Sequence, residues 1–591
     1  MGKIKKLCTL VRNYGVRTTF HIARTKLFST RKAQNRKLAG RIKLSMAGDK
    51  LSQECDTRFE YEPLISILIP LYNTDIGMLK CVIESVVNQT YAKWELCLCD
   101  ASDDGHSQVH NSCMEYAGKD CRIRYKKLDT NLGIADNTNA CADMAKGEYY
   151  GLLDHDDILH PSALFEVVNE INNSKADFIY TDEITFEGEI YNILSSNFKP
   201  DFSKDTLRAN NYICHFTVFS KALFDSAGGF RSEYDGSQDH DLFLRLTGKA
   251  VKISHIPKVL YFWRAHKASV VSDIHAKEYA IDAGRRAVKD YLYSIGCKAE
   301  VVSTDIYPTI YKINYPLPEN GRISIIIPNR NHVEDLKRCI NSILKSAYSD
   351  YEIIIVENNS TDKEIFDYYA ELSKDGKIKV ITHNIPFNYS ELNNTAAAKA
   401  TGDYLLFLNN DTEVINADWL SEMLMFAARE DVGAVGARLF YENNTLQHCY
   451  IITGAGENRV AIHAGLGLAK DDYGYLDRIG FNQNVSAVTG ACLMVSREKF
   501  FAVNGFDEKL PVAYNDIDLC LKLRQKNWVN IYTPFATLYH YESMSRGKDV
   551  DARSIVRLEE EARYMKDKWK DGLRDPYYNP NFSLDRQYIL E

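Results

Sequence analysis

The sequence has no apolar run that approaches the roughly 18 to 20 residues needed to cross a bilayer. Its start also lacks the compact apolar core and small-residue cleavage site of a secretory signal. We therefore expect a cytoplasmic protein. Proline and glycine are few, at 14 and 32 of 591 residues, while hydrophobic residues make up 45%. Such a composition excludes disordered and collagen-like chains and indicates a globular protein of two to four domains.

Motifs of several common protein classes are missing. The 14 cysteines form no CxxC pair, which argues against a zinc ribbon or a disulfide framework. The pair Cys97 and Cys99 lies inside an apolar run and is typical of buried small side chains. No GxGxxG follows the first apolar run of either half, and no Walker loop is present. A dinucleotide-dependent oxidoreductase and a P-loop enzyme are therefore disfavoured.

An excess of positive over negative charge is confined to the N-terminus. The net charge is −8, but residues 1–50 hold eight Lys and six Arg against one acid, so they carry +13 and the remaining 541 residues carry −21. Apolar residues such as Leu10 and Phe20 interleave with these bases, as expected for a segment on an anionic membrane surface. A solvated basic tail, or a helix packed on the body, is the alternative. The acidic remainder would repel phosphate, so we expect no nucleic-acid partner.

An internal repeat organises the rest of the chain. Residues 64–74 (LISILIPLYNT) form an apolar run, followed by a helix-like stretch and a second apolar run, WELCLCDAS, that ends near Asp100. About 260 residues later RISIIIPNRNH, a helix-like stretch and YEIIIVENNS repeat the order, the last ending near Glu357. Short Ile/Val/Leu runs bounded by turn residues are typical of buried parallel strands, and the intervening segments supply crossover helices. The repeat predicts two doubly wound α/β domains.

Five segments follow from this organisation. We expect a basic amphipathic segment over residues 1–60, a first α/β domain over 61–272, a linker over 273–320, a second α/β domain over 321–550 and a C-terminal helix and tail over 551–591. In the linker, residues 276–295 favour a helix and residues 306–315 favour a strand. The Pro and Gly of PLPENG mark its end.

A third apolar run in each half ends in polar residues: YYGLLDHDD at 149–157 and YLLFLNNDT at 404–412. In open α/β sheets the ligand lies at the carboxyl ends of the strands, so we expect chemistry there. Clustered acids repel one another unless a cation is bound, and Asp154 and Asp156 therefore predict a divalent metal, Mg²⁺ or Mn²⁺, completed by phosphate oxygens. Asp157 is also compatible with capping the helix that begins near Pro161.

The order of these motifs resembles family 2 inverting glycosyltransferases of the GT-A fold. The first half carries ILIPLYN, LLDHDD, GSQDHDLFLRL and YFWRAHKAS, and the second carries IIIPNRN, FLNNDT, TGACLMVSR, YNDIDLCLKLR and LYHYESMSRG. With the closing DPYYNPN, the chain is similar to large two-domain glycosyltransferases of bacterial O-antigen, capsule or rhamnose-rich polysaccharide synthesis. The resemblance covers residues 64–272 and 322–583.

For the first half, the resemblance implies that Asp239 is the general base. Donor-nucleotide contacts fall on Pro70, Tyr72, Asp100 and Asp154, metal ligands on Asp156 and His266, and a diphosphate contact on Arg264. Chemistry agrees with the first of these roles, because attack by a sugar hydroxyl requires a carboxylate within hydrogen-bond reach to take its proton. The departing nucleoside diphosphate gains negative charge, which a cation would stabilise.

For the second half, the resemblance places the base at Asp516. Nucleotide contacts fall on Pro328, Glu357 and Asn409, metal ligands on Asp411 and His540, and acceptor-side contacts on Thr489 and Gly490. The sequence departs from the family pattern at Asn409, where the first acid of the DxD motif is an amide. A neutral oxygen attracts a metal less strongly but can still bind a ribose. We favour two working sites.

The resemblance therefore implies a bifunctional enzyme that takes UDP- or dTDP-sugars and extends a growing or lipid-linked glycan. The basic N-terminus would hold it at the inner face of the plasma membrane. Two alternatives remain: a chain in which the first domain alone is catalytic and the second binds acceptor glycan, and a non-catalytic glycan-binding scaffold. Retention of Asp154, Asp156 and Asp239 argues against the scaffold.

Overall fold

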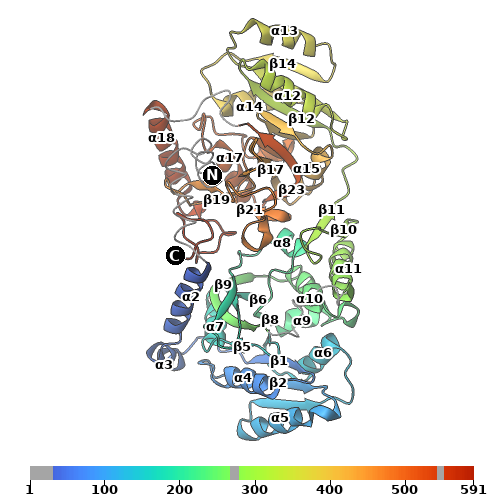
Figure 1. Ribbon diagram of the computed structural model, residues 1–591, viewed down its shortest axis with the longest axis vertical. Coiled ribbons are helices and arrows are strands. Elements are labelled where there is room, and N and C mark those ends of the chain that lie inside the picture. The colour runs from blue at the N-terminus through green and yellow to red at the C-terminus, as the bar shows by residue number, and fades with distance from the viewer. Residues whose placement is uncertain (1–30, 266–277, 542–551) are drawn as a thin grey trace, which may run out of the picture.

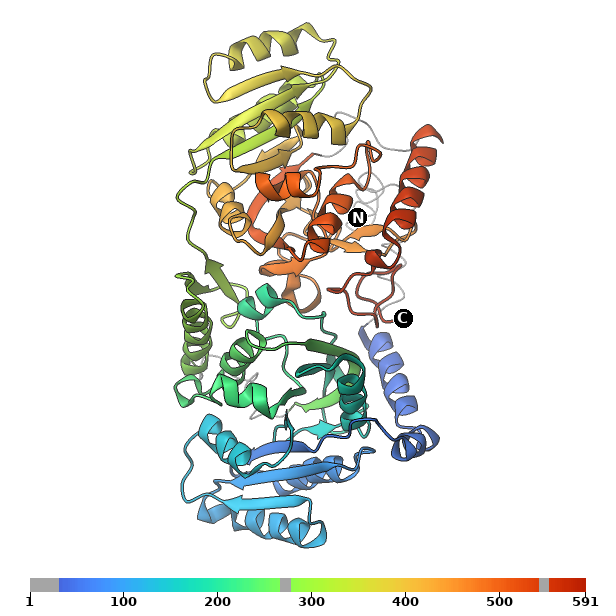
Figure 2. The same cartoon turned by 180° about the vertical axis from the view of Figure 1, so that it is seen from behind.

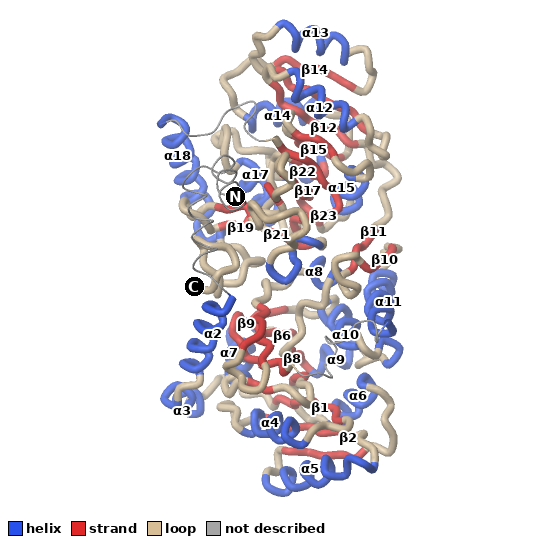
Figure 3. The backbone as a smooth tube through the Cα atoms, viewed as in Figure 1, coloured by secondary structure: helices blue, strands red, loops and turns tan. Residues whose placement is uncertain are grey.

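The computed structural model describes residues 31–265, 278–541 and 552–591. Two α/β domains follow each other along the long axis of the molecule, and each consists of a β-sheet covered by helices (Figures 1 and 3). The two tandem α/β domains that the repeat predicts are confirmed. Across the described ranges, no helix is both long and apolar enough to span a membrane.

The first domain is built on a mixed sheet in the order β3-β2-β1-β4-β8-β6-β9-β5, with β7 paired to β6. β1 runs parallel to β2 and β4, while β8 is antiparallel to both of its neighbours. The strands are β1 Ile65–Leu71, β2 Trp94–Asp100, β3 Ile123–Lys127, β4 Tyr149–Leu152, β5 Ile158–Leu159, β6 Phe178–Phe186, β7 Ile193–Asn197, β8 Thr217–Ser220 and β9 Ile253–Arg264. The helices are α4 Ile76–Val87, α5 Ser107–Lys119, α6 Ile134–Met144, α7 Ala163–Ser174, α8 Lys204–Ala209, α9 Lys221–Ala227 and α10 Gln238–Thr247.

The second domain repeats this arrangement with the order β14-β13-β12-β15-β22-β17-β23-β16, to which β18 and β21 add at β17 and β23. The strands are β12 Ile323–Asn329, β13 Tyr351–Glu357, β14 Ile378–Thr382, β15 Tyr404–Leu408, β16 Thr412–Val414, β17 Val432–Phe440, β18 Leu446–His448, β21 Gln483–Val485, β22 Cys492–Ser496 and β23 Val529–His540, beside the separate hairpin β19 Ile451–Thr453 and β20 Ala461–His463. The helices are α12 Val333–Ile343, α13 Lys363–Leu372, α14 Tyr389–Lys399, α15 Trp419–Ala427, α16 Arg497–Ala502 and α17 Asn515–Gln525.

The repeat extends to individual buried hydrogen bonds. In the first domain Ser66 donates to Glu95 and accepts from the N–H of Gly147, and in the second domain Ser324 has the same partners, Glu352 and Gly402. A Cβ on either glycine would lie 2.8 Å or less from the backbone of the neighbouring strand. Both turns therefore require glycine, and they bring the third parallel strand of each domain against the first.

The linker packs on the first domain. α11 (Glu278–Ser294) lies against α10, and β10 (Glu300–Ser303) pairs antiparallel with β11 (Tyr311–Asn314). The strand expected over residues 306–315 is shorter than predicted, because a turn that contains Pro308 occupies its first half and Thr304 N–H bonds to Ile310 C=O across it. The helix expected over 276–295 is observed as α11.

The two ends of the described chain meet beside the domain boundary. α2 (Arg31–Ser45) and α3 (Gly48–Asp56) lie along the first domain, and α18 (Ala552–Trp569) lies along the second on the same side of the molecule (Figures 1 and 2). The tail after α18 then enters the boundary, where Asn579 donates 2.9 Å hydrogen bonds to Asp182 and to the Lys199 carbonyl. An ion pair between Asp205 and Arg429 also joins the two domains.

Candidate active sites

The strand ends of each sheet carry the polar residues that the sequence singles out. In the first domain Asp100 ends β2, Asp154 and Asp156 follow β4, Asp239 lies in the first turn of α10, and Arg264 ends β9. In the second domain the corresponding residues are Glu357 at the end of β13, Asn409 and Asp411 after β15, Asp516 in the first turn of α17, and His540 at the end of β23. His266 lies outside the described residues. So do residues 1–30, the larger part of the basic segment that was predicted to lie on a membrane.

The two acids expected to contact the donor base are both buried and already hydrogen-bonded. Asp100 accepts from Ser102 N–H, from the hydroxyl of Tyr125 at 2.9 Å and from Lys127 at 3.2 Å. Glu357 accepts from the hydroxyl of Tyr369 at 2.7 Å and from Ser360. Burial and these acids raise the pKa of Tyr125 and of Tyr369. A bound base would therefore have to exchange partners with groups of the protein.

Two further predicted nucleotide contacts differ in accessibility. Pro70, on β1, is half-buried, whereas Tyr72 just beyond that strand is 47% exposed. An exposed aromatic side chain beside a strand end is available to stack on a ligand. Pro328, which corresponds to Pro70 in the second domain, lines the cavity described below.

The acids after β4 have separate surroundings. Asp154 is 46% exposed and lies 3.5 Å from Nε2 of His215. Asp157 is fully buried, accepting from the hydroxyl of Tyr261 and from Arg264 N–H at 2.7 Å. Burial raises the pKa of Asp157 well above its usual range. Asp157 thus holds the loop after β4 against β9 by hydrogen bonds, while the side chain of Asp154 remains partly exposed to solvent.

Arg264 is held by this same loop. Its Nε donates 2.8 Å to the carbonyl of Asp156, and its guanidinium lies over the ring of Phe186. The predicted diphosphate contact is therefore placed at the edge of the acid cluster, with part of its donor capacity already used.

The predicted base of the first domain sits among residues that sequence reasoning missed. Asp239 Oδ2 accepts from Cys214 Sγ at 2.6 Å and from Asn211 at 3.2 Å. Next to Cys214, His215 lies 3.4 Å from Glu183 Oε2. Burial opposes protonation of His215, but Glu183 together with Asp154 and Asp157 outweighs it and raises its pKa to about 9. The signal in the sequence was the pair of acids Asp182 and Glu183 in the middle of the strand β6, which begins and ends with phenylalanine.

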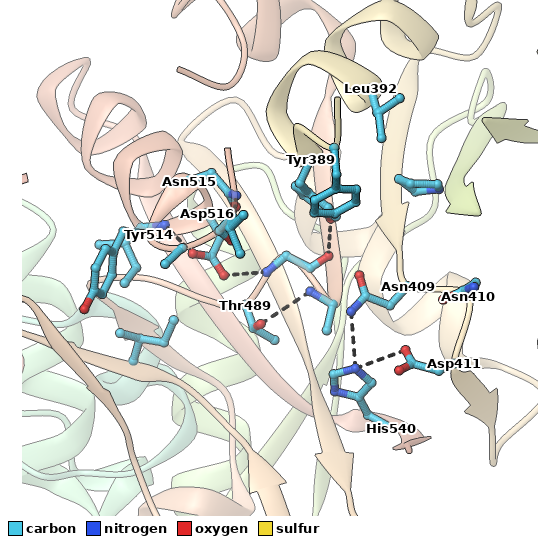
Figure 4. A pocket seen from close by; sticks show the side chains of 18 of the residues that line it. Tyr389, Leu392, Asn409, Asn410, Asp411, Thr489, Tyr514, Asn515, Asp516 and His540 are labelled. Carbon is cyan, nitrogen blue, oxygen red and sulfur yellow. Dashed lines mark hydrogen bonds and ion pairs between the residues drawn. The ribbon is translucent and has the colours of Figure 1, made fainter. Parts of the chain in front are cut away.

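The second domain holds a cavity of about 770 Å³ at its strand ends. Its walls include most of the residues predicted for this half: Pro328, Asn409, Asp411, Thr489, Gly490, Asp516 and His540. Figure 4 shows Asp516 on one side of this cavity and the group of Asn409, Asp411 and His540 on the other. Glu357 is buried and is not among the lining residues, although its neighbour Asn358 is. Convergence of a carboxylate, an imidazole and amides in one cleft is the pattern of a binding site.

His540 joins the two strand-end residues on its side of the cavity. Its Nε2 lies 3.3 Å from Asp411 Oδ1 and 3.2 Å from Nδ2 of Asn409. A carboxylate and an imidazole nitrogen that converge on one point suit a divalent cation, and rotation of the Asn409 amide would add an oxygen. Within the described residues no three His, Cys, Asp or Glu side chains form a metal cluster, so two protein ligands would need completion by donor oxygens or water.

A single turn, residues 489–491, ties the two sides of the cavity together. Gly490 N–H donates 2.8 Å to Asp516 Oδ2, Gly490 C=O accepts from the hydroxyl of Tyr389, and Ala491 C=O accepts from Asn409 N–H. Burial raises the pKa of Asp516, against the opposing effect of the hydrogen bond from Gly490 N–H. A carboxylate with a raised pKa is a stronger base, which suits proton removal.

The second acid of α17 has a different role. Asp518 is fully buried and accepts from the indole of Trp569 at 2.9 Å and from Lys568 at 2.7 Å. Both partners belong to α18, so Asp518 anchors that helix. The neighbouring carboxylates of α17 are therefore divided between the cavity and the packing of the C-terminal helix.

Comparison with known proteins agrees with the repeat. A sequence model described as Glycosyl transferase family 2 matches residues 66–227 and 324–501, more than half of the chain. The chain therefore belongs to glycosyl transferase family 2.

Individual relatives are longer than this chain. It is 41% identical over 556 residues to the uncharacterized protein y4gI of Sinorhizobium fredii, covering 93% of this chain and 60% of that protein. It is 34% identical over 540 residues to the O-antigen biosynthesis protein RfbC of Myxococcus xanthus, covering 90% of this chain and 41% of that protein. The chain thus spans less than two thirds of either relative. The crystal structure of S. aureus TarS 1-349 matches with 18% identity and a TM-score of 0.31, over 39% of this chain and 65% of that one.

Proposed function

We propose that the chain transfers sugars from nucleotide-sugar donors to a bacterial surface polysaccharide at two sites, one in each domain. The observation that carries the proposal is the cavity of the second domain, in which the base candidate Asp516 faces Asn409, Asp411 and His540. The first domain has corresponding polar residues at the same strand ends, among them Asp154 and Asp156, the two acids of its DxD motif. Family membership of both halves supports the proposal.

In each site the chain's own residues have two roles. The carboxylate of Asp239 or Asp516 takes the proton of the attacking acceptor hydroxyl. The strand-end acids Asp100 and Glu357 bind the donor base, exchanging their present hydroxyl partners. Attack from the face opposite the leaving diphosphate inverts the anomeric carbon.

A divalent cation, Mg²⁺ or Mn²⁺, would be held by Asp156 with His266 in the first site and by Asp411 with His540 in the second. Bound there, it supplies positive charge that stabilises the departing nucleoside diphosphate. Arg264 adds a fixed positive charge at the edge of the first site. In the second site Asn409 contributes no charge, so we expect weaker metal binding than in the first.

The proposed donors are UDP- or dTDP-sugars, and the proposed acceptor is a growing or lipid-linked glycan. Relatives support a polymer product: one is named an O-antigen biosynthesis protein, and a further relative, 26% identical, is named the chondroitin synthase of Pasteurella multocida. The proposed location is the cytoplasm, peripheral at the inner face of the plasma membrane. The exposed basic side chains of α2 support that placement, because this helix has six Lys or Arg and no acid among its 15 residues.

The second candidate function keeps catalysis in the first domain and uses the second to bind acceptor glycan. The replacement of an acid by Asn409 favours it. The cavity that brings Asp516 opposite Asp411 and His540 favours catalysis instead, because glycan binding alone does not require a base beside a metal-type ligand pair.

Release of nucleoside diphosphate by the purified full chain tests the proposal. A panel of UDP-, dTDP- and GDP-sugars is incubated with Mn²⁺ or with EDTA, with and without glycan acceptors. Asp239→Asn should abolish one transfer and Asp516→Asn the other. Asp225→Asn and Asp350→Asn, the same change at exposed positions, are the controls. Loss of both transfers in either single variant would refute two independent sites, and no release from any donor would refute the enzyme itself.

A further inference from the structure

Two histidines at the second site form a hydrogen-bonded pair. His448, the last residue of β18, is fully buried, and its Nδ1 lies 2.8 Å from Nδ1 of His463, the last residue of β20. The other nitrogen of His448, Nε2, accepts from the N–H of Thr489 at 3.3 Å. Thr489 belongs to the turn that also holds Asp516. The histidine pair is thus hydrogen-bonded directly to the turn formed by residues 489–491.

The hydrogen-bond directions fix the proton positions on both rings. Because a backbone N–H can only donate, Nε2 of His448 must accept and carries no proton. Neutral His448 therefore has its proton on Nδ1 and donates it to His463. His463 Nδ1 is then an acceptor, and the proton of the neutral His463 ring is on Nε2, the nitrogen on the far side of the ring. Burial of His448, with His463 and His540 close by, lowers its pKa well below the usual range and keeps it neutral.

His463 reaches the cavity from an element that the first domain builds differently. It is half-buried and lines the same cavity as Asp516, on the hairpin β19–β20. The tail residue Gln587 fixes this hairpin by donating to the carbonyl of His463 and accepting from Gly465 N–H. In the first domain the corresponding connection, between β6 and β8, consists of β7 and α8. The second site therefore has a rigidly placed imidazole of its own.

We propose that His463 recognises the acceptor in the second site, donating from Nε2–H to a hydroxyl or ring oxygen of the acceptor sugar beside the hydroxyl that Asp516 deprotonates. His448 acts through His463 as a positioning residue, by holding that tautomer. The inference rests on the proposed function, because it assigns a specificity role within the second site. A neutral donor suits a sugar oxygen, and it leaves the carboxylate of Asp516 available for the transferred proton.

Kinetics of the full chain in an Asp239→Asn background isolate the second site. The acceptor probes are methyl glycosides and disaccharides that accept sugar from the wild-type chain. His463→Leu should raise the acceptor KM by about tenfold, the size expected for a lost hydrogen bond of ~1.4 kcal/mol, with donor KM unchanged. His463→Gln, which retains an amide N–H donor, should restore most of the affinity. His448→Leu should raise the acceptor KM in the same direction.

Other outcomes distinguish a failure of the role proposed for His463 from a failure of the glycosyltransferase proposal. An unchanged acceptor KM in His463→Leu, or a change in donor KM instead, overturns the role of His463 while leaving the glycosyltransferase proposal intact. Absence of nucleotide release in the wild type overturns the proposed function itself. If the Leu variants do not fold, ¹⁵N NMR of histidine-labelled wild-type chain decides: a protonated Nε2 and unprotonated Nδ1 on His463 support the inference, and the opposite tautomer overturns it.

Discussion

The backbone N–H of Gly490 donates a 2.8 Å hydrogen bond to Oδ2 of Asp516, the proposed base of the second domain. The residues come from different elements, a turn before β22 and the first turn of α17, and are 26 positions apart. The turn formed by residues 489–491 is therefore hydrogen-bonded to Asp516, to Asn409 and to His448 of the His448–His463 pair. Positioning of the base, the donor side and the acceptor side therefore depends on one short segment.

Gly490→Ala should impair the second site without unfolding the chain. An added Cβ would lie 3.2 Å from the Tyr389 hydroxyl and 3.5 Å from Cβ of Asp516, so the turn must shift by a few tenths of an ångström. We expect about a tenfold loss of second-site kcat/KM, because small displacements of a base are costly. Gly118→Ala, whose Cβ meets nothing within 4 Å, is the matched control. Equal effects of the two substitutions on second-site transfer would show that the turn does not position Asp516.

Asn409→Asp should tighten metal binding at the second site. It places a second carboxylate beside Asp411 and His540, and one added charge near a cation is worth ~1.4 kcal/mol, or about tenfold in affinity. Titration of the metal-free chain with Mn²⁺, followed by electron paramagnetic resonance in an Asp156→Asn background, measures this directly. Asn443→Asp adds the same charge in an exposed turn and should change nothing. Unaltered Mn²⁺ affinity in Asn409→Asp would contradict a metal site at Asp411.

Lys199→Met should destabilise the first domain. This lysine is fully buried and donates to the carbonyls of Ile213 and His215, with Glu183 3.4 Å away. Removing it leaves the buried Glu183 without its main cation, at a cost of about 3–5 kcal/mol. The double variant Lys199→Met/Glu183→Gln should recover part of that loss.

Urea unfolding of the first domain measures these changes. Lys252→Met, at an exposed position, serves as the control. A double variant no more stable than Lys199→Met would show that the unpaired charge of Glu183 is not the cause, and would leave the lost carbonyl hydrogen bonds as the explanation.

Sequence reasoning predicted the strand-end residues because parallel strands bring their carboxyl ends to one edge of a sheet. Asp154 and Asn409 could be located in this way, whereas Asp239 and Asp516, in the first turns of α10 and α17, were located through the family resemblance. Asn409 and Asp516 line one cavity in the second domain. Their assigned roles remain predictions. The acids after β4 could be grouped from sequence, but the partners of Asp157 on β9, more than 100 residues away, could not.

The residues that were missed come from the antiparallel part of each sheet and from the β19–β20 hairpin. Glu183, His215, His448 and His463 lie in or beside strands whose pairing depends on long connections rather than on a local repeat. Sequence spacing does not reveal that residues 15 apart, such as His448 and His463, face each other across two hairpins. The linker strand was overestimated for a local reason, since the turn at Pro308 shortens it.

Stability of the first domain should fall as pH rises from about 6.5 to about 9, through His215. Its pKa is about 9 when folded, from Glu183 with Asp154 and Asp157 against the effect of burial, and 6.5 is its ordinary value. A group with a raised folded pKa stabilises fully below its unfolded pKa and loses that contribution as pH passes its folded pKa. The contribution is about 1–3 kcal/mol. Urea unfolding of the metal-free chain between pH 6 and 9.5 should show this slope, and His215→Gln should flatten it; an equal slope in His215→Gln would assign the pH dependence to other groups.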